Sequence, residues 1–185
     1  MVADLLMRVR RTPKRILHQL RRRQALGALR RRPRPARLLA VCHGNICRSP
    51  FAAALLGRAL APFAIEVESA GFIAPDRPAP REAVTAAARR GVDLSEHRSR
   101  LLTADLAGAA DLIMVMDPTQ QRIVCERFGR WPRDVVVLGD LDPAPVEGRT
   151  IRDPINQTVE VFDQSYERIE RCVRALAGAL SSAGG

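Results

Sequence analysis

A stretch from Cys42 to Pro50, Cys-His-Gly-Asn-Ile-Cys-Arg-Ser-Pro, constrains the fold of this chain more than any other feature. It follows a short apolar run and precedes a segment rich in Ala and Leu, which is the order strand, loop, helix. Five residues separate Cys42 from Arg48. A loop of that length can wrap one tetrahedral oxyanion and aim successive backbone N–H groups at it. We therefore expect an anion-binding loop that contains a cysteine.

The chemistry of the loop favours an anion and a thiolate together. Ser49 can cap the following helix and Pro50 suits its first position, so the positive helix N-terminus would point at the loop. A helix N-terminus and a neighbouring arginine lower the pKa of a cysteine, so we expect Cys42 to be a thiolate at neutral pH. Arg48 can present a planar fork to two phosphate oxygens, which a lysine cannot reproduce.

Strand and helix patterns alternate along the rest of the chain. We expect strands at 38–42, 65–69, 111–116 and 135–138, and helices at 50–60, 81–90, 118–128 and 159–180. This alternation predicts the α/β class, with three layers and a four-stranded parallel sheet that has helices on both faces. Ligands of such sheets bind beyond the carboxyl ends of the strands. The phosphate-binding loop, which follows the first strand, would lie there.

The loop resembles the signature of bacterial low-molecular-weight protein tyrosine phosphatases, and the resemblance extends from about Arg37 to Ala179. Further matches occur in the family's order at 68–71, 91–100, 114–117 and 153–154. The resemblance implies a hydrolase for phosphotyrosine on proteins, in which Cys42 attacks phosphorus and forms a phosphocysteine. Arg48 would clamp the phosphate, and Asp153 would be the general acid and base. The phosphate-binding loop would consist of His43, Gly44, Asn45, Ile46, Cys47, Arg48 and Ser49.

The general acid has three candidates, because Asp117, Asp142 and Asp153 each precede a proline. Asp117 ends a strand and precedes a helix, a position that capping explains. Asp153 lies just before the last helix, where the family's general acid occurs, so we choose it. Asp142 is the reserve candidate, because the Pro-rich stretch between the two can fold in more than one way.

The resemblance also implies supporting residues around the loop. Asn45 would fix its unusual backbone, and the Ser49 hydroxyl would steady the thiolate. Ser69 and His97 would belong to the same hydrogen-bond network, although His97 can equally satisfy a helix or turn end. Cys47 either forms a reversible disulfide with Cys42 under oxidation or fills space. We expect no cofactor and no metal, since a zinc site on the loop cysteines lacks further ligands at sensible spacing.

The sequence departs from the family where the substrate ring would lie. Family phosphatases commonly place one or two tyrosines after the Asp-Pro pair, whereas this chain continues Ile-Asn-Gln-Thr at 155–158. Phe72 and Ile73 can supply one apolar side of the cleft instead. Family members that act on phosphoarginine tend to carry threonine at the position of Ile46, so the isoleucine favours phosphotyrosine.

Three alternatives stay open beside the tyrosine phosphatase. They are a protein-arginine phosphatase, an arsenate reductase, and a catalytically weak phosphate-binding module tethered by its basic N-terminus. The reductases need a pair of resolving cysteines after the second helix, and residues 82–100 contain none. The partner that family analogy suggests is a phosphotyrosine protein, such as a bacterial tyrosine kinase or a polysaccharide-assembly enzyme.

Charge divides the chain of 185 residues into two parts. Residues 1–37 contain 13 Lys and Arg against one acid, Asp4, whereas the remainder carries a formal charge of −2. We therefore assign residues 1–36 to a basic N-terminal extension and 37–185 to the phosphatase domain. Four scattered cysteines and the lack of a secretory signal indicate the reducing cytoplasm, and a peripheral place at the inner face of the membrane is the alternative within that compartment.

The extension has the pattern of an amphipathic helix. Six apolar residues fall on one side of it, with arginines elsewhere, and Pro13 would kink or divide it; the six are Leu5, Leu6, Val9, Ile16, Leu17 and Leu20. Three interpretations follow: a solvated tail, a helix of residues 1–34 on an anionic membrane surface, or a nucleic-acid contact. No aromatic residue precedes Phe51, which argues against single-stranded nucleic acid.

Overall fold

A four-stranded parallel sheet forms the centre of the molecule. The computed structural model describes the backbone of residues 2–182 and the side chains of residues 13–182. The strands are β1 (Arg37–Cys42), β2 (Glu66–Gly71), β3 (Leu112–Val115) and β4 (Val135–Val137). Their order in the sheet is β2-β1-β3-β4, and each pair is parallel. The predicted α/β class and the four predicted strands are confirmed.

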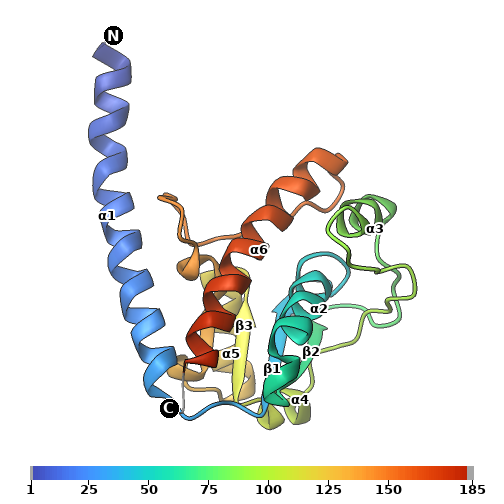
Figure 1. Cartoon of the computed structure of the whole chain (residues 1–185). Coiled ribbons are helices and arrows are strands. Elements are labelled where there is room, and N and C mark those ends of the chain that lie inside the picture. Colours follow the sequence, from blue (N-terminus) through green and yellow to red (C-terminus); the bar gives the residue numbers. More distant parts are fainter. Residues whose placement is uncertain (1, 183–185) are drawn as a thin grey trace.

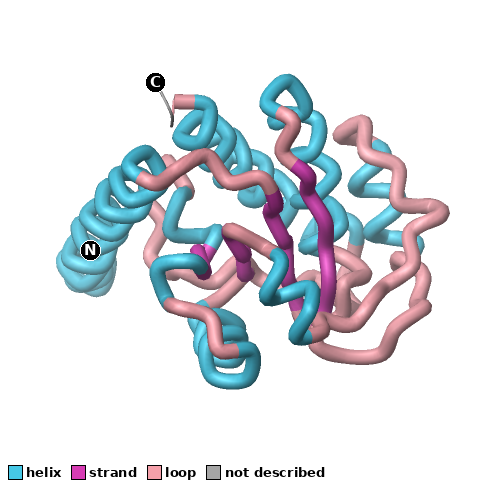
Figure 2. The backbone as a smooth tube through the Cα atoms, turned by 90° about the horizontal axis from the view of Figure 1, so that it is seen from below, coloured by secondary structure: helices cyan, strands magenta, loops and turns pink. Residues whose placement is uncertain are grey.

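Helices cover both faces of this sheet (Figure 2). One face carries α2 (Arg48–Leu60) and α6 (Val159–Ser181), with α3 (Arg81–Ala88) packed against α6. The other face carries α4 (Ala104–Ala109) and α5 (Pro118–Phe128). Three single-turn 3₁₀ helices complete the fold: η1 (Ala61–Phe63), η2 (Pro132–Asp134) and η3 (Leu138–Leu141).

The side chains of β1 alternate between two hydrophobic cores. Leu38, Ala40 and Cys42 belong to the core beneath α2 and α6, whereas Leu39 and Val41 belong to the core beneath α4 and α5. A strand that is buried on both faces is typical of the middle of a parallel sheet. The alternation therefore places the cysteine that ends β1 on the α2 side.

The first residues of two helices carry capping signals in the sequence, of which one was recognised and one was missed. Asp117 caps α5, since its Oδ1 accepts a hydrogen bond from Gln120 N at 2.8 Å, and this confirms the capping prediction. The prediction missed α4, a helix of six residues. Its start carries a comparable signal, because Thr103 Oγ1 accepts from Leu106 N at 3.2 Å.

The basic extension folds as one helix, α1 (Val2–Arg31), which continues through Pro13. The expected division at Pro13 is therefore wrong. Figure 1 shows that α1 ends near the edge of the sheet where β1 begins. Its N-terminal part extends beyond the opposite edge, where β1 ends and the phosphate-binding loop begins.

The C-terminal part of α1 is docked on the rest of the molecule. It packs against α6 and η3, and Leu26 and Leu29 are buried in the core on that face. His18, also buried, donates from Nε2 to Asp142 O at 2.9 Å, and Arg22 Nε donates to Leu141 O at 3.2 Å. The interpretation of the extension as a solvated tail is thus wrong for this part of the helix.

The buried leucines of α1 should contribute to the stability of the whole molecule. We expect Leu29→Ala to lower the free energy of unfolding by about 2–4 kcal/mol, because the side chain is 2% exposed and would leave a cavity. Leu20→Ala is the matched control on the same helix, since Leu20 is 50% exposed. Urea unfolding of both variants is the measurement. Equal effects of the two substitutions would show that the helix does not dock as described.

Candidate active site

A cavity of about 100 Å³ opens where β1 ends, and the phosphate-binding loop forms its floor. Ten residues from three segments line it: Cys42, His43, Gly44, Ile46, Cys47, Arg48, Ile73, Arg77, Asp153 and Ile155. The structure thus brings Cys42, Arg48 and Asp153, predicted from separate parts of the chain, to one cleft. We refer to this cavity as the catalytic cleft.

The loop joins β1 to α2 without a side-chain cap. The helix begins at Arg48, Cys47 occupies the N-cap position, and Ser49 lies in the first turn. The prediction that Ser49 caps the helix is therefore wrong. Its hydroxyl is used elsewhere, because Ser49 Oγ donates to Cys42 Sγ at 3.0 Å.

Asn45 holds the loop to its surroundings. Its backbone has φ of 52°, a left-handed conformation that asparagine tolerates better than most residues. The fully buried side-chain amide donates from Nδ2 to Ser49 Oγ at 3.0 Å and to Ser69 Oγ at 2.9 Å. Its Oδ1 accepts from Arg100 N at 2.9 Å. All the hydrogens and the oxygen of this buried amide are hydrogen-bonded, which such a group requires.

His97 contacts the same loop from the segment that follows α3. Its Nε2 donates to Asn45 O at 2.6 Å, so the imidazole helps to hold the left-handed turn. Ser69 and Ser49 also bond to Asn45, as described above. The four residues predicted to surround the nucleophile are therefore joined in one network: Asn45, Ser49, Ser69 and His97.

Gly71 allows β2 to approach the loop closely. A Cβ at this position would lie 2.7 Å from Asn45 N and 2.9 Å from Gly44 C. Contacts this short with backbone atoms cannot be relieved by a side-chain movement. The next residue also fixes the loop, since Phe72 N donates to His43 O at 2.8 Å.

Arg48 is the buried cation of the cleft, with 3% of its surface exposed. Its Nη1 donates to Ile151 O at 3.0 Å, and its Nη2 forms an ion pair and hydrogen bond with Asp153 Oδ2. Among the described residues, none accepts a hydrogen bond from the buried Nε. An oxyanion in the cleft would satisfy that donor.

Asp153 is half-buried and lines the cleft, whereas the reserve candidate Asp142 forms ion pairs outside it. Asp142 is completely buried and pairs with Arg171 at 3.0 Å and Arg168 at 3.1 Å, both from α6. Burial alone would raise the pKa of Asp142. Hydrogen bonds from Arg171 and Ala144 N, with both arginine charges, outweigh burial and hold its pKa below the usual value. A carboxylate held in this way is a poor proton donor.

The pKa of Cys47 is shifted in the opposite direction to that of Asp142. Burial raises the pKa of its thiol far above the usual value, and the charges of Cys42 and Asp153 raise it further. The backbone carbonyl of Cys47 accepts from the buried Tyr166 hydroxyl at 3.1 Å, and the Tyr166 ring stacks on Phe51. Cys47 is thus a protonated thiol, and Tyr166 supports the loop from α6 in a way that the sequence did not indicate.

The walls of the cleft are aliphatic and carry one further cation. Ile73 and Ile155 line it together with Ile46, whereas Phe72 packs into the core beneath α4 and α5. The expectation that Phe72 supplies a wall is wrong, because the bend that follows β2 directs Phe72 to the core and Ile73 to the cleft. Arg77 also lines the cleft, and sequence reasoning missed it, since a single arginine in a Pro-rich loop carries no local signal.

This arrangement can bind an oxyanion and attack it with a thiol, and comparison with known proteins agrees. The family described as low molecular weight phosphotyrosine protein phosphatase matches residues 37–184. A relative from Ralstonia nicotianae, named probable low molecular weight protein-tyrosine-phosphatase EpsP, is 38% identical over 148 residues, which are 80% of this chain and 97% of the relative. The chain belongs to this family, and the resemblance of its sequence motifs is confirmed.

Two further comparisons show the breadth of the family. The protein-arginine-phosphatase of Bacillus subtilis is 32% identical over 149 residues, 77% of this chain and 95% of that protein. The crystal structure of the Erwinia amylovora tyrosine phosphatase AmsI superposes with a TM-score of 0.72 at 31% identity. That match covers 80% of this chain and 94% of the other.

The close approach of β2 to the loop makes Gly71 a sensitive position. We expect Gly71→Ala to displace the loop backbone and to lower kcat for a small aryl phosphate by about 10²-fold, since small errors of placement have effects of that size. Gly57→Ala in α2 is the control, because a Cβ there meets nothing within 4 Å. Steady-state kinetics measure kcat for both variants. An unchanged kcat for Gly71→Ala would contradict the tight packing between β2 and the loop.

Proposed function

We propose that this protein is a phosphatase that hydrolyses phosphotyrosine on proteins through a phosphocysteine intermediate. The observation that carries the proposal is the convergence of Cys42, Arg48 and Asp153 on one small cleft, with the Arg48 Nε directed to no described residue. Family membership supports it, and so do the names of relatives such as EpsP. In this proposal the loop from His43 to Ser49 cradles the phosphate.

The first chemical step forms the phosphocysteine. Phosphate oxygens replace the Asp153 carboxylate as partners of Arg48. Asp153, released from Arg48, takes up a proton from water and faces the leaving oxygen. The Cys42 thiolate attacks phosphorus in line, the bond between phosphorus and the phenolic oxygen breaks, and Asp153 gives its proton to that oxygen. The Ser49 hydroxyl, 3.0 Å from Cys42 Sγ, stabilises the sulfur as an anion before attack and when it leaves.

The second step returns the enzyme to its starting state. Water attacks phosphorus, and the Asp153 carboxylate takes a proton from it. The bond between phosphorus and Cys42 Sγ breaks, which releases inorganic phosphate and the thiolate. Arg48 and the loop amides hold the equatorial oxygens in both steps, so catalysis is mostly positioning and charge stabilisation.

A protein-arginine phosphatase is the second candidate, because the Bacillus subtilis relative carries that name. The cleft itself favours phosphotyrosine. Ile46 lies in the loop, Ile73 and Ile155 form aliphatic walls that suit a phenyl ring, and the cationic Arg77 would repel the guanidinium of phosphoarginine. Arsenate reduction has less support, since burial raises the pKa of Cys172 to about 12, which makes it a poor resolving thiol.

Three substitutions test the chemistry. We expect Cys42→Ser to abolish turnover of phosphotyrosine peptides. We expect Asp153→Asn to lower kcat by about 10²–10⁴-fold for phenols that leave slowly and by much less for phenols that leave easily, because only the former need a proton. Asp142→Asn should show no such dependence on the leaving group.

Steady-state rates on a series of aryl phosphates measure these effects, with phosphoarginine peptides and arsenate with thioredoxin assayed beside them. Full activity of Cys42→Ser would refute the mechanism. Faster turnover of phosphoarginine than of phosphotyrosine would replace the substrate assignment.

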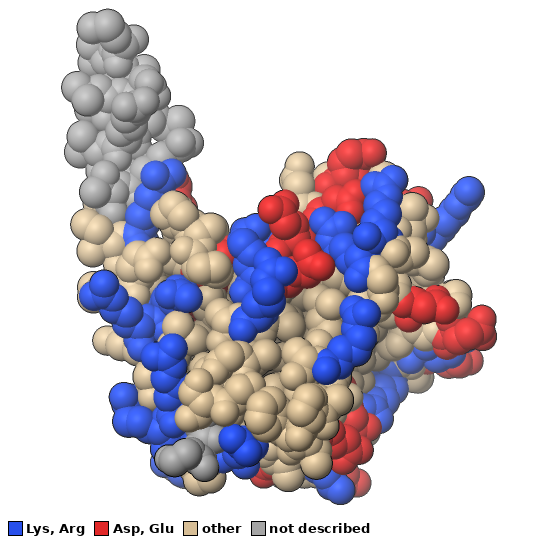
Figure 3. Space-filling model, in the orientation of Figure 1, with Lys and Arg blue, Asp and Glu red and all other residues tan. Residues whose placement is uncertain are grey.

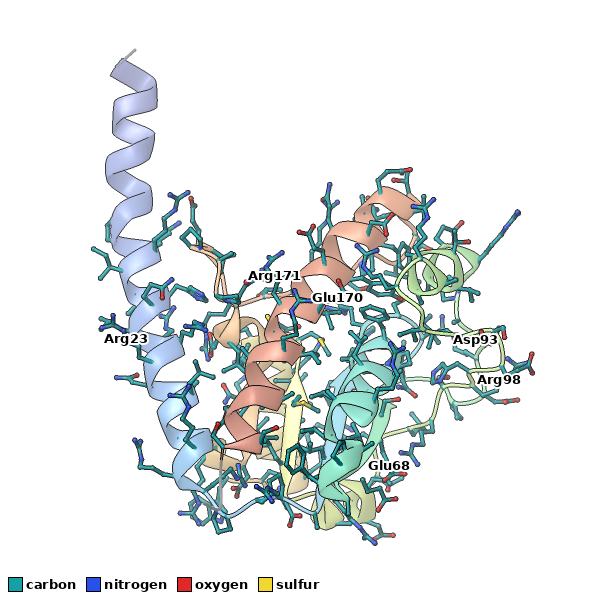
Figure 4. All side chains as sticks on the ribbon, viewed as in Figure 1. Arg23, Glu68, Asp93, Arg98, Glu170 and Arg171 are labelled. Atoms are coloured by element: carbon teal, nitrogen blue, oxygen red, sulfur yellow. The ribbon has the colours of Figure 1, made fainter. Side chains whose placement is uncertain are left out.

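We also propose that residues 1–36 are an extension of the phosphatase domain, residues 37–185, and that α1 binds an anionic membrane surface. Ile16, Leu17 and Leu20 are exposed on the side of α1 opposite its docked residues His18, Arg22, Leu26 and Leu29. Arg23 projects from α1 away from the body of the molecule (Figure 4), and basic side chains lie along the lower part of α1 in Figure 3. Residues 1–37 contain 13 basic residues and one acid, and this net charge of +12 complements anionic lipid.

Such binding would be peripheral and would place the protein at the inner face of the membrane. Among the helices of the described residues, none combines the length and apolar character needed to cross a bilayer. A cytoplasmic tyrosine kinase or polysaccharide-assembly enzyme at that surface would then be a suitable phosphotyrosine partner. This partner is proposed from the family, not from any contact in the structure.

Vesicle flotation of the full chain tests the membrane contact. We expect binding to vesicles that contain about one third anionic lipid, no binding to neutral vesicles, and release by salt, since each basic residue near the surface contributes about 1 kcal/mol. The triple variant Ile16→Gln, Leu17→Gln, Leu20→Gln should bind much more weakly. Trp131→Gln, which removes an exposed apolar residue outside α1, should bind as the wild type does. Equal flotation of the triple variant and the wild type would contradict the proposal.

A further inference from the structure

A second hollow adjoins the catalytic cleft. Its volume is about 510 Å³, and its lining includes Ile46, Arg77 and Ile155, which also line the cleft. The remaining lining residues are Pro78, Pro80, Glu82, Asn156 and Gln157. Because three residues belong to both spaces, a peptide whose phosphorylated side chain enters the cleft can continue into this groove. We refer to it as the flanking groove.

Arg77 lies between β2 and α3, in a segment that backbone hydrogen bonds hold to Ser99. Its backbone N donates to Ser99 Oγ at 3.0 Å, and its backbone O accepts from Ser99 N at 2.9 Å. Ser99 is buried, and its hydroxyl donates in turn to Ala74 O at 2.9 Å. Two segments far apart in sequence therefore fix the position from which the Arg77 side chain starts.

The guanidinium of Arg77 reaches over the phosphate-binding loop. A Cβ built on Gly44 would lie 3.5 Å from Arg77 Nη1. The side chain is half-buried, yet no described residue accepts a hydrogen bond from it or forms an ion pair with it. A partly exposed guanidinium without a protein partner can pair with an anion that enters the cleft.

Two arginines near Arg77 do have protein partners. Arg48 pairs with Asp153, and Arg100 pairs with Glu68 at 2.7 Å and donates to Ser69 O at 2.8 Å. The flanking groove contains one acid among its lining residues, Glu82 in the first turn of α3, and no ion pair joins it to Arg77. The groove thus offers an unpaired guanidinium directly beside the place of the reacting phosphate.

We propose that Arg77 is the centre of an anion-binding subsite that selects substrates with a second negative group next to the phosphotyrosine. The group is a side-chain carboxylate or a second phosphate, since both accept the two parallel hydrogen bonds of a guanidinium fork. This proposal rests on the phosphatase function proposed above. It also gives the groove a role in choosing the protein partner, in a cleft that lacks tyrosines after the Asp-Pro pair.

Phosphotyrosine peptides that differ only in one flanking residue test the subsite. Three peptides carry glutamine, glutamate or phosphoserine beside the phosphotyrosine. We expect the wild type to show kcat/KM about tenfold higher for an anionic flank than for glutamine, mainly through a lower KM. In Arg77→Gln the ratio between anionic and neutral peptides should fall to about one. Arg77→Lys should keep part of it, because the charge stays but the fork is lost.

Arg81→Gln is the matched control. It removes the same charge from an exposed residue of α3 that lines neither space, so it should keep the wild-type preference. Preference for glutamate alone, or for phosphoserine alone, identifies which anion the subsite takes. Equal kcat/KM for the three peptides with the wild type overturns the proposal.

A small aryl phosphate separates this role from direct catalysis. If Arg77→Gln lowers its kcat/KM by the same factor as that of the anionic peptides, Arg77 acts on the reacting phosphate and the subsite does not exist. Binding of the three peptides to Cys42→Ser by calorimetry measures the preference without turnover. Preferential binding with no activity in the wild type would then refute the phosphatase function and leave the subsite standing.

Discussion

The hydrogen bonds of the Asn45 carboxamide hold the catalytic cleft together. One buried side chain joins the phosphate-binding loop to Ser49 at the start of α2, to Ser69 on β2 and to the backbone of Arg100. Loss of this amide would leave several buried polar groups without partners, each at a cost of about 1–3 kcal/mol. The left-handed backbone at Asn45 depends on these bonds, and the direction of the whole loop depends on that backbone.

The chemistry of the site comes from segments that only the folded sheet brings together. Arg48 begins α2, whereas Asp153 and its neighbour Ile151 precede α6 by a few residues, yet both contact the arginine. The alternation of β1 between two cores directs Cys42 to the same side of the sheet. Arg48 holds the Asp153 carboxylate in the cleft, beside the place where the proposed mechanism requires an acid.

Local patterns in the sequence were sufficient for the four strands, the longer helices and the anion-binding loop, whereas the choice of Asp153 rested on the family resemblance. The motif residues carry their own signals: glycine, arginine and Ser-Pro in the loop, and Asp-Pro before the last helix. The helix position of Ser49 could not be predicted in this way, because a serine before proline also reads as a cap. The direction of Phe72 and the proximity of Arg77 to Gly44 depend on packing between segments far apart in sequence.

The place of the basic extension in the fold also could not be predicted from local sequence patterns. Its periodicity predicted a helix, but the docking of Leu26 and Leu29 depends on a surface built by η3 and α6, more than 100 residues later. A proline within a helix weakens it locally. Residues after Pro13 are held by their contacts with the body, so the helix there does not depend on the preceding turn.

The docking of α1 has a consequence during synthesis of the chain. The helix leaves the ribosome before η3 and α6, which together form its binding surface. At about 5–20 residues per second, the interval between them is roughly 7–30 s. Throughout that time Leu26 and Leu29 have no native partner, and a basic helix with apolar residues on two sides is exposed to the surroundings. The nascent chain therefore exposes more apolar surface for non-specific binding than the folded protein does.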